Sequence, residues 1–201
     1  LTATVPFTYL VSPAFLPVTV QTDGPGGGTS GTLFFGVDNQ PATLIARLPV
    51  SATVFSPLTL DVFANNVAAG TQLRWNSTAL TPTTMISASE YMADVPLSLY
   101  PTGGTYTIPM LSPAPPVSGV VSTNALTMTV YNPAPSPRFA NPATTIAGTA
   151  GVTVTFDTQA NQPSFINGIQ VWLAGELRNT QYISSTQIRV GLLVTDVDTA
   201  A

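Results

Sequence analysis

The sequence contains no cysteine and no histidine, and all of its basic residues are arginines. Without cysteine there is no disulfide, thiolate nucleophile or cysteine-ligated metal site. Without histidine the commonest general base near neutral pH is missing. Without lysine there is no Schiff base, no P-loop lysine and no lysine–asparagine isopeptide crosslink. We therefore expect a protein that is not an enzyme and that needs no cofactor or metal.

Charge of either sign is also scarce. Charged residues make up 7% of the 201 residues and the net charge is −4, whereas roughly 25% is usual in a soluble domain. The five basic residues are scattered: Arg47, Arg74, Arg138, Arg178 and Arg189. They form no basic footprint for nucleic acid and no polybasic patch for a lipid surface. We expect no nucleic-acid partner.

Long apolar runs are missing as well, although the mean hydropathy is positive at +0.32. Every apolar run is broken within about ten residues, whereas a membrane-spanning helix needs about 20. We therefore expect no membrane insertion. Threonine, serine, asparagine and glutamine take the place of charge, which is typical of a secreted β-protein. We predict an extracellular location at a cell surface, and a mature or excised segment, because the start resembles no signal peptide.

Short stretches that alternate between apolar and polar residues indicate strands. Such alternation occurs at residues 1–5, 58–62, 126–130 and 152–156, and a period of two puts one set of side chains on a core face. Turn residues separate these stretches, for example the glycine-rich segment 23–28. No window holds a helical period over three turns. The sequence therefore predicts an all-β protein.

The chain also resembles itself at a spacing of 97 residues. Across that spacing, three apolar pairs match: Trp75 with Trp172, Leu80 with Leu177, and Ile86 with Ile183. At slightly shorter spacings, residues 1–6 match 91–96, which are 90 residues later, and 29–39 match 122–132, which are 93 residues later. Units of about 95 residues with short strands indicate immunoglobulin-like (Ig-like) sandwiches.

This spacing divides the chain into three parts. We predict the closing strands of one Ig-like module in residues 1–39, a complete module in 40–132, and the opening strands of another module in 133–201. Because residues 188–201 align with 1–14, two explanations stay open. Either the chain is part of a longer repeat protein, or one subunit completes the sandwich begun by the next. The overlapping strand would be surplus in a perfect exchange, which favours the longer chain.

Four segments in a fixed order carry a family resemblance: AGTQLRWN at 69–76, ISASE at 86–90, ADVP at 93–96 and STNALTMTVYNP at 122–133. In this order they resemble the IPT/TIG family, whose Ig-like domains recur in tandem on bacterial secreted or surface proteins. The resemblance implies tandem Ig-like β-sandwiches of the E-set type. The chain departs from the family where Ser77 replaces the usual glycine after Trp-Asn. Domains of this family act as spacers, adhesion modules or enzyme appendages.

Aromatic residues provide the first candidate sites. Trp75 and Trp172 could form a sugar-binding platform, but their recurrence favours packing at the end of a strand. Tyr100 and Tyr106 are the candidate contacts to a glycan if the protein is an adhesin.

Carboxylates provide the second group. Five aspartates could supply ligands to a Ca²⁺ ion: Asp61, Asp94, Asp157, Asp196 and Asp198. Only the last two are close in sequence and no glycine-containing loop surrounds them, which favours solvated strand ends. Glu90 and Glu176 occupy different modules, which argues against a glycosidase pair. Asn76 begins a formal glycosylation sequon, and a turn is the simpler interpretation.

The leading functional hypothesis is a structural repeat unit of an extracellular fibre, filament or large cell-surface protein, assembled head to tail from Ig-like modules. Its partners would be other copies of the protein or neighbouring modules. One alternative is an adhesin that binds carbohydrate or another surface. The other is a non-catalytic appendage of a secreted enzyme.

Overall fold

The computed structural model describes residues 2–113, 119, 121–160 and 162–198. The chain divides into two compact units, which are described separately. The first unit comprises Leu1–Ser51, Pro57–Leu99 and Thr105–Thr129, and the second comprises Ala52–Ser56, Tyr100–Gly104 and Val130–Ala201. Regular structure in the described residues consists of strands and three single 3₁₀ turns. No helix in that part of the chain is long and apolar enough to cross a membrane.

The amino-terminal segment of the first unit forms two small antiparallel sheets. A 3₁₀ turn, η1 (Phe7–Tyr9), precedes the strands β1 (Ala14–Val18), β2 (Gln21–Thr22), β3 (Gly28–Thr29) and β4 (Leu33–Val37). Strand β1 pairs with β4, and β2 pairs with β3 across the predicted glycine-rich turn. The turn needs glycine at position 24, where φ is +101°. Large apolar side chains on both strands of the β1–β4 pair stay exposed to solvent.

The centre of the first unit contains an antiparallel sheet of four strands in the order β10-β11-β7-β5. Its strands are β5 (Thr43–Leu48), β7 (Leu58–Asn65), β10 (Thr83–Ser87) and β11 (Glu90–Val95). Burial alternates along β7 and β11, so that Leu60, Val62 and Tyr91 point to the core. Two of the segments predicted from alternation, 58–62 and 126–130, are strands in the structure, the latter within β14 (Leu126–Tyr131).

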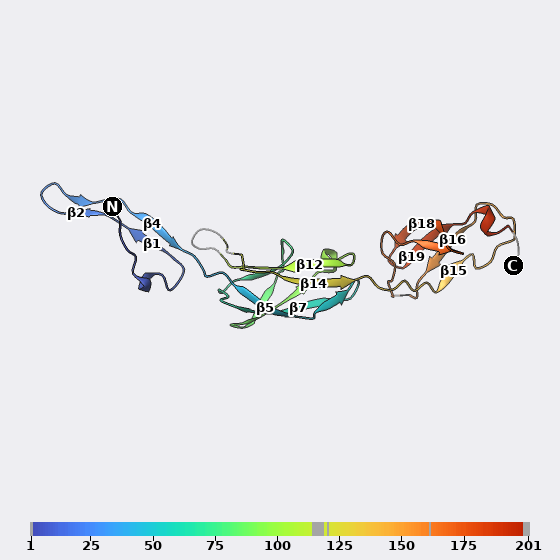
Figure 1. The fold of residues 1–201 in the computed structure, drawn as a ribbon, viewed down its shortest axis with the longest axis horizontal. Helices are drawn as coiled ribbons and strands as arrows, with labels where there is room; N and C mark the ends of the chain where they lie inside the picture. The colour runs from blue at the N-terminus through green and yellow to red at the C-terminus, as the bar shows by residue number, and fades with distance from the viewer. Residues whose placement is uncertain (1, 114–118, 120, 161, 199–201) are drawn as a thin grey trace. The chain divides into compact units, whose positions relative to one another are not determined.

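A second layer covers this sheet. The remaining strands form the orders β12-β14-β6 and β13-β8-β9. Their bounds are β6 (Ser51–Thr53), β8 (Gln72–Trp75), β9 (Thr78–Ala79), β12 (Gly104–Ile108) and β13 (Met110–Leu111). Figure 1 shows β12 and β14 in one layer and β5 and β7 in the other. From this second layer, the side chains of Ile108 and Met128 are buried in the core. Two layers of strands around one apolar core make an Ig-like β-sandwich, as predicted.

The second unit is built on a five-stranded antiparallel sheet in the order β15-β16-β19-β18-β17. Its strands are β15 (Phe139–Asn141), β16 (Thr153–Asp157), β17 (Val171–Leu173), β18 (Glu176–Ser184) and β19 (Gln187–Gly191), followed by the 3₁₀ turn η3 (Val194–Asp196). The buried apolar side chains that residues 133–198 contribute to this unit are Val154, Phe165, Ile188 and Val190. Strand β16 lies over the predicted segment 152–156.

The prediction of a strand at residues 1–5 is wrong for residues 2–5, which are the part of it that the structure describes. Residues 2–6 have no regular structure. The residues that they match in sequence, 91–96, lie largely in β11, which pairs with β7 on one side and β10 on the other. The start of the chain has no such neighbours among the described residues. An alternating segment forms a strand only where its backbone groups find hydrogen-bonding partners.

Candidate functional site

Trp75 is a core residue at the end of β8. Its side chain is 1% exposed, and its indole N–H donates a hydrogen bond to the carbonyl oxygen of Leu99 at 3.0 Å. The ring stacks on Tyr106, with centroids 4.8 Å apart. Trp75 therefore packs within the sandwich and offers no open platform for a sugar.

Trp172, matched with Trp75 in the sequence, lies in a different environment and is 60% exposed. In the β8–β9 hairpin Trp75 pairs with Thr78 across a two-residue turn. In the β17–β18 hairpin the residues that flank the turn are Leu173 and Glu176. The structural counterpart of Trp75 is therefore Leu173, one residue later. A shift of one residue moves a side chain to the opposite face of a sheet.

The same shift separates the matched leucines. Leu80 is fully buried, whereas Leu177 is 50% exposed. By hairpin position the counterpart of Leu80 is Arg178, which is also buried. Ile86 and Ile183 are both exposed, so this matched pair shares an outer face and contributes little to either core.

Tyr100 corrects a further expectation. As a glycan contact it had to be exposed, but its side chain is completely buried, which raises the pKa of its hydroxyl. That hydroxyl donates a hydrogen bond to the carbonyl oxygen of Ser56 at 2.7 Å. Tyr106 is half-buried with one ring face against Trp75. The sequence shows which residues are aromatic but not whether each of them is buried.

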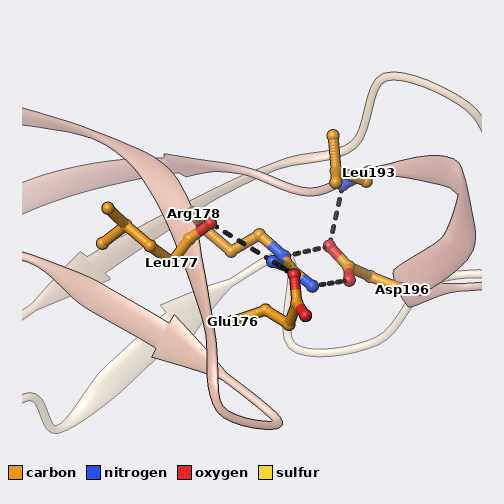
Figure 2. Close-up of polar contacts among 5 residues, drawn as sticks. All are labelled: Glu176, Leu177, Arg178, Leu193 and Asp196. Carbon is orange, nitrogen blue, oxygen red and sulfur yellow. Dashed lines mark hydrogen bonds and ion pairs between the residues drawn. The ribbon is translucent and has the colours of Figure 1, made fainter.

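The buried Arg178 forms an ion pair with Asp196 (Figure 2). Its Nε donates to Asp196 Oδ2 at 2.6 Å, and its Nη2 donates to Oδ1. Asp196 Oδ2 also accepts the backbone N–H of Leu193 at 2.8 Å. Glu176 lies 3.7 Å from Arg178 Nη1 but is largely exposed. The paired geometry connects β18 to η3 and satisfies two buried charges within the second unit.

We expect this pair to contribute to the acid response of the second unit. The hydrogen bond from Arg178 lowers the pKa of Asp196, against the opposing effect of burial, and it raises the pKa of Arg178. A carboxyl whose pKa is lower in the folded state stabilises the fold fully above its unfolded pKa of about 4. This contribution is lost as the pH falls through the lower, folded pKa.

We therefore expect the second unit to lose stability in acid more steeply than an Asp196→Asn variant does. The measurement is the thermal midpoint of unfolding of both proteins between pH 2 and pH 7, at steps of about half a pH unit. Asp198→Asn is the matched control, because Asp198 is exposed and should leave the acid response unchanged. If the thermal midpoint fell with pH equally in the parent chain and in Asp196→Asn, the result would contradict a role of this ion pair in the acid response.

The other predicted carboxylates do not form one site. Asp94 accepts a hydrogen bond from the hydroxyl of Thr59 at 2.5 Å, and Asp157 accepts one from the amide of Gln187 at 2.8 Å. Asp61 lies within β7. The part of the chain that the structure describes contains no group of three or more potential metal ligands of the His, Cys, Asp or Glu types. Glu90 and Glu176 belong to different units.

Asn76 lies in the turn between β8 and β9, with φ of +54°. Its Oδ1 accepts hydrogen bonds from the backbone N–H of Thr107 at 2.9 Å and from its hydroxyl at 3.1 Å. The interpretation of this sequon as a turn is confirmed in structure, since a left-handed conformation is one that asparagine tolerates well.

Strand β17 forms one edge of the sheet of the second unit. This strand is the last of the sheet order, so one of its edges has no partner strand among the described residues. An apolar groove of about 240 Å³ lies beside it, lined in part by Phe156, Phe165 and Trp172. Sequence reasoning missed Phe165, the single aromatic residue in the long connection between β16 and β17. Such an edge can bind another strand.

Comparison with known proteins adds little at the level of sequence: no family model and no curated protein matches the chain. The full extracellular region of plexin A4 is similar over 76% of this chain and 15% of its own, with 10% identity and a TM-score of 0.34. A tandem from titin is similar over 75% of this chain and 56% of its own, with 11% identity and a TM-score of 0.28. The chain therefore spans less than two thirds of either structure. The fold assignment rests on the strand pairing and the core.

Proposed function

We propose that this chain is a structural element of an extracellular fibre or large cell-surface protein, built from Ig-like modules of the IPT/TIG type. In this proposal residues 1–39, 40–132 and 133–201 are the closing part, the whole and the opening part of successive modules. The proposal includes the absence of enzymatic activity. Its main support is that hydrogen-bonding details of the strands recur along the chain.

The hairpins β10–β11 and β18–β19 give the clearest recurrence. Met85 pairs with Tyr91 and Tyr182 pairs with Ile188. In each hairpin the register then shifts before a serine, Ser87 in the first and Ser184 in the second. Each pair of matched residues is 97 apart in the sequence. The same irregularity at the same position supports a common module, because bulges are specific features of a sheet.

A second recurrence links the amino-terminal segment to the central sandwich. The backbone N–H of Val20 donates to Ser30 Oγ at 2.9 Å, and that of Met110 donates to Ser122 Oγ at 3.2 Å. In return, Ser30 N–H donates to Val20 O at 2.8 Å and Ser122 N–H to Met110 O at 2.9 Å. This reciprocal pair of bonds supports the view that residues 1–39 have the design of closing strands.

The surface and the linker composition suit a structural role. Few charges lie on the exterior, so lateral packing would depend little on salt. Four of the 19 prolines lie within residues 133–142, and proline restricts the backbone by fixing φ. A chain of this kind would act as a stiff spacer. The exposed ring of Trp172 favours one alternative, an adhesin that uses this residue to contact a glycan.

Surface labelling together with a glycan screen tests the proposal. An antibody against residues 1–201 should label intact, unpermeabilised cells of the source organism, or their shed fibres. The purified chain should bind no member of a glycan array, and a Trp172→Ala variant should behave identically. Labelling that requires permeabilisation would contradict the structural role at the cell surface. Glycan binding that disappears in Trp172→Ala would establish the adhesin instead.

A further inference from the structure

We infer that the free edge of β17 binds residues 17–21 of a second copy of this chain, as an added antiparallel strand. This inference rests on the proposed function, because it specifies how one copy joins the next. The contact is between two different surfaces, so each copy can bind one further copy through each of them.

The central sandwich shows what covers the corresponding edge. There, β8 pairs with β13, with Leu73 opposite Met110. The backbone N–H of Arg74 donates to Pro109 O at 3.0 Å, and that of Asn76 donates to Thr107 O at 2.7 Å. Residues 107–111 therefore run along β8 as its outer neighbour.

Strand β17 is the counterpart of β8. In each strand, a backbone N–H two residues before the end of the strand donates to a threonine hydroxyl. The N–H of Leu73 donates to Thr83 at 3.1 Å, and that of Val171 donates to Thr180 at 3.2 Å. Because successive N–H groups of a strand point to opposite edges, the N–H of Trp172 points away from β18. It corresponds to the N–H of Arg74, which binds Pro109 O in the sandwich.

Residues 17–21 are the counterpart of residues 107–111. The reciprocal serine bonds match Val20 with Met110, 90 residues apart. The 3₁₀ turns agree with this spacing, since Tyr9 N–H donates to Pro6 O at 3.0 Å and Leu99 N–H donates to Pro96 O at 2.9 Å. On this register Val20 would lie opposite Val171.

The two surfaces differ from the central sandwich in a complementary way. In the sandwich, Thr107 donates its backbone N–H to the side chain of Asn76. Pro17, which corresponds to Thr107, has no backbone N–H to donate. Ala174, which corresponds to Asn76, has no side-chain acceptor. The donor and its acceptor are missing together, so the proposed pairing leaves neither one unsatisfied. The backbone bonds from Trp172 N–H to Thr19 O and from Ala174 N–H to Pro17 O remain available.

The apolar side chains are complementary as well. In the sandwich, Trp75 stacks on Tyr106. The corresponding residues are Leu173, which is exposed, and Leu16, which is half-buried. The pairing would place two leucines where the sandwich has two aromatic rings. This burial removes apolar surface from water on both copies, in addition to forming the backbone bonds.

Disulfide crosslinking between two separately tagged chains tests the register. The parent sequence has no cysteine, so a Val20→Cys chain and a Val171→Cys chain can form a mixed dimer only through the introduced thiols. At micromolar concentration under mild oxidation, we expect at least about ten times more mixed dimer than from Val20→Cys with Leu173→Cys. In that control pair the thiols are displaced by two residues, beyond the reach of a disulfide.

Gln21→Cys with Gln170→Cys is the second pair in the same register, and both glutamines are exposed. Mixed dimer from neither pair, or equal amounts from the displaced control, would overturn the inference. A Trp172→Pro change in the Val171→Cys chain should abolish the crosslink, because it removes the edge N–H, whereas Trp172→Ala should retain it. Crosslinking that is lost equally in both would show that the ring, and not the strand edge, makes the contact.

The crosslinking experiment and the cell-labelling experiment test the β17 contact and the proposed function separately. Failure of the crosslink in a protein that labels intact cells would overturn the β17 contact and leave the structural role in place. A specific crosslink in a protein found only inside cells would leave the contact in place and overturn the extracellular role.

Discussion

Replacing Trp75 by alanine should destabilise the first unit by about 3–5 kcal/mol, the usual cost of deleting a large buried aromatic side chain. The ring is buried against Tyr106, and its removal leaves a cavity and takes away the hydrogen-bond donor to Leu99 O. Chemical denaturation followed by far-ultraviolet circular dichroism measures the change. The remaining tryptophan, Trp172, lies in the second unit and should report an unchanged transition by fluorescence.

Trp172→Ala is the matched control for this substitution. Since Trp172 is mostly exposed, its removal should change the stability by less than about 0.5–1 kcal/mol. Equal losses in the two variants would contradict the one-residue difference between the hairpins. A stable Trp75→Ala protein would contradict the placement of Trp75 in the core.

Replacing Phe165 by alanine should have an effect of similar size on the second unit, again about 3–5 kcal/mol. Phe165 is 1% exposed, and its backbone N–H donates a hydrogen bond to the carbonyl oxygen of Ser185 at 2.9 Å. Together with Ile188 it lines the groove beside β17. The variant should unfold at a lower denaturant concentration when Trp172 fluorescence is followed, with the transition of the first unit unchanged.

Phe139→Ala is the control for the loss of a phenyl ring from the same unit. Phe139 lies on β15 at the opposite end of the sheet order and is 57% exposed, so we expect a loss below about 1 kcal/mol. If Phe165→Ala were as mild as Phe139→Ala, the connection between β16 and β17 would not contribute to the core.

The strands and turns were largely predictable because their signals are local. Alternation predicted β7, β14 and β16, and the glycine-rich segment predicted the turn between β2 and β3. The spacing of 97 also matched Ile86 with Ile183, which lie at the same place in two similar hairpins. In these cases the pattern and the structure depend on the same few neighbouring residues.

The candidate sites were less predictable, because burial depends on which strand lies opposite. Sequence identity aligned Trp75 with Trp172, but the turn that follows begins one residue later in the second hairpin. The same difference replaces the buried Leu80 by Arg178, whose partner Asp196 is 18 residues away. Nothing near Arg178 in the sequence indicates that its charge is buried.

By itself, then, the sequence determined that the chain is all-β, where its main turns fall, and which chemistries its residue types do not provide. Only the tertiary structure decided that Trp75 and Tyr100 are buried, that Trp172 is exposed, and that one edge of β17 has no partner strand within the described part of the chain. The physical reason is that side-chain alternation is a property of one strand, whereas core, edge and ion pair are properties of its neighbours. Hydrogen bonding and packing between distant segments select those neighbours.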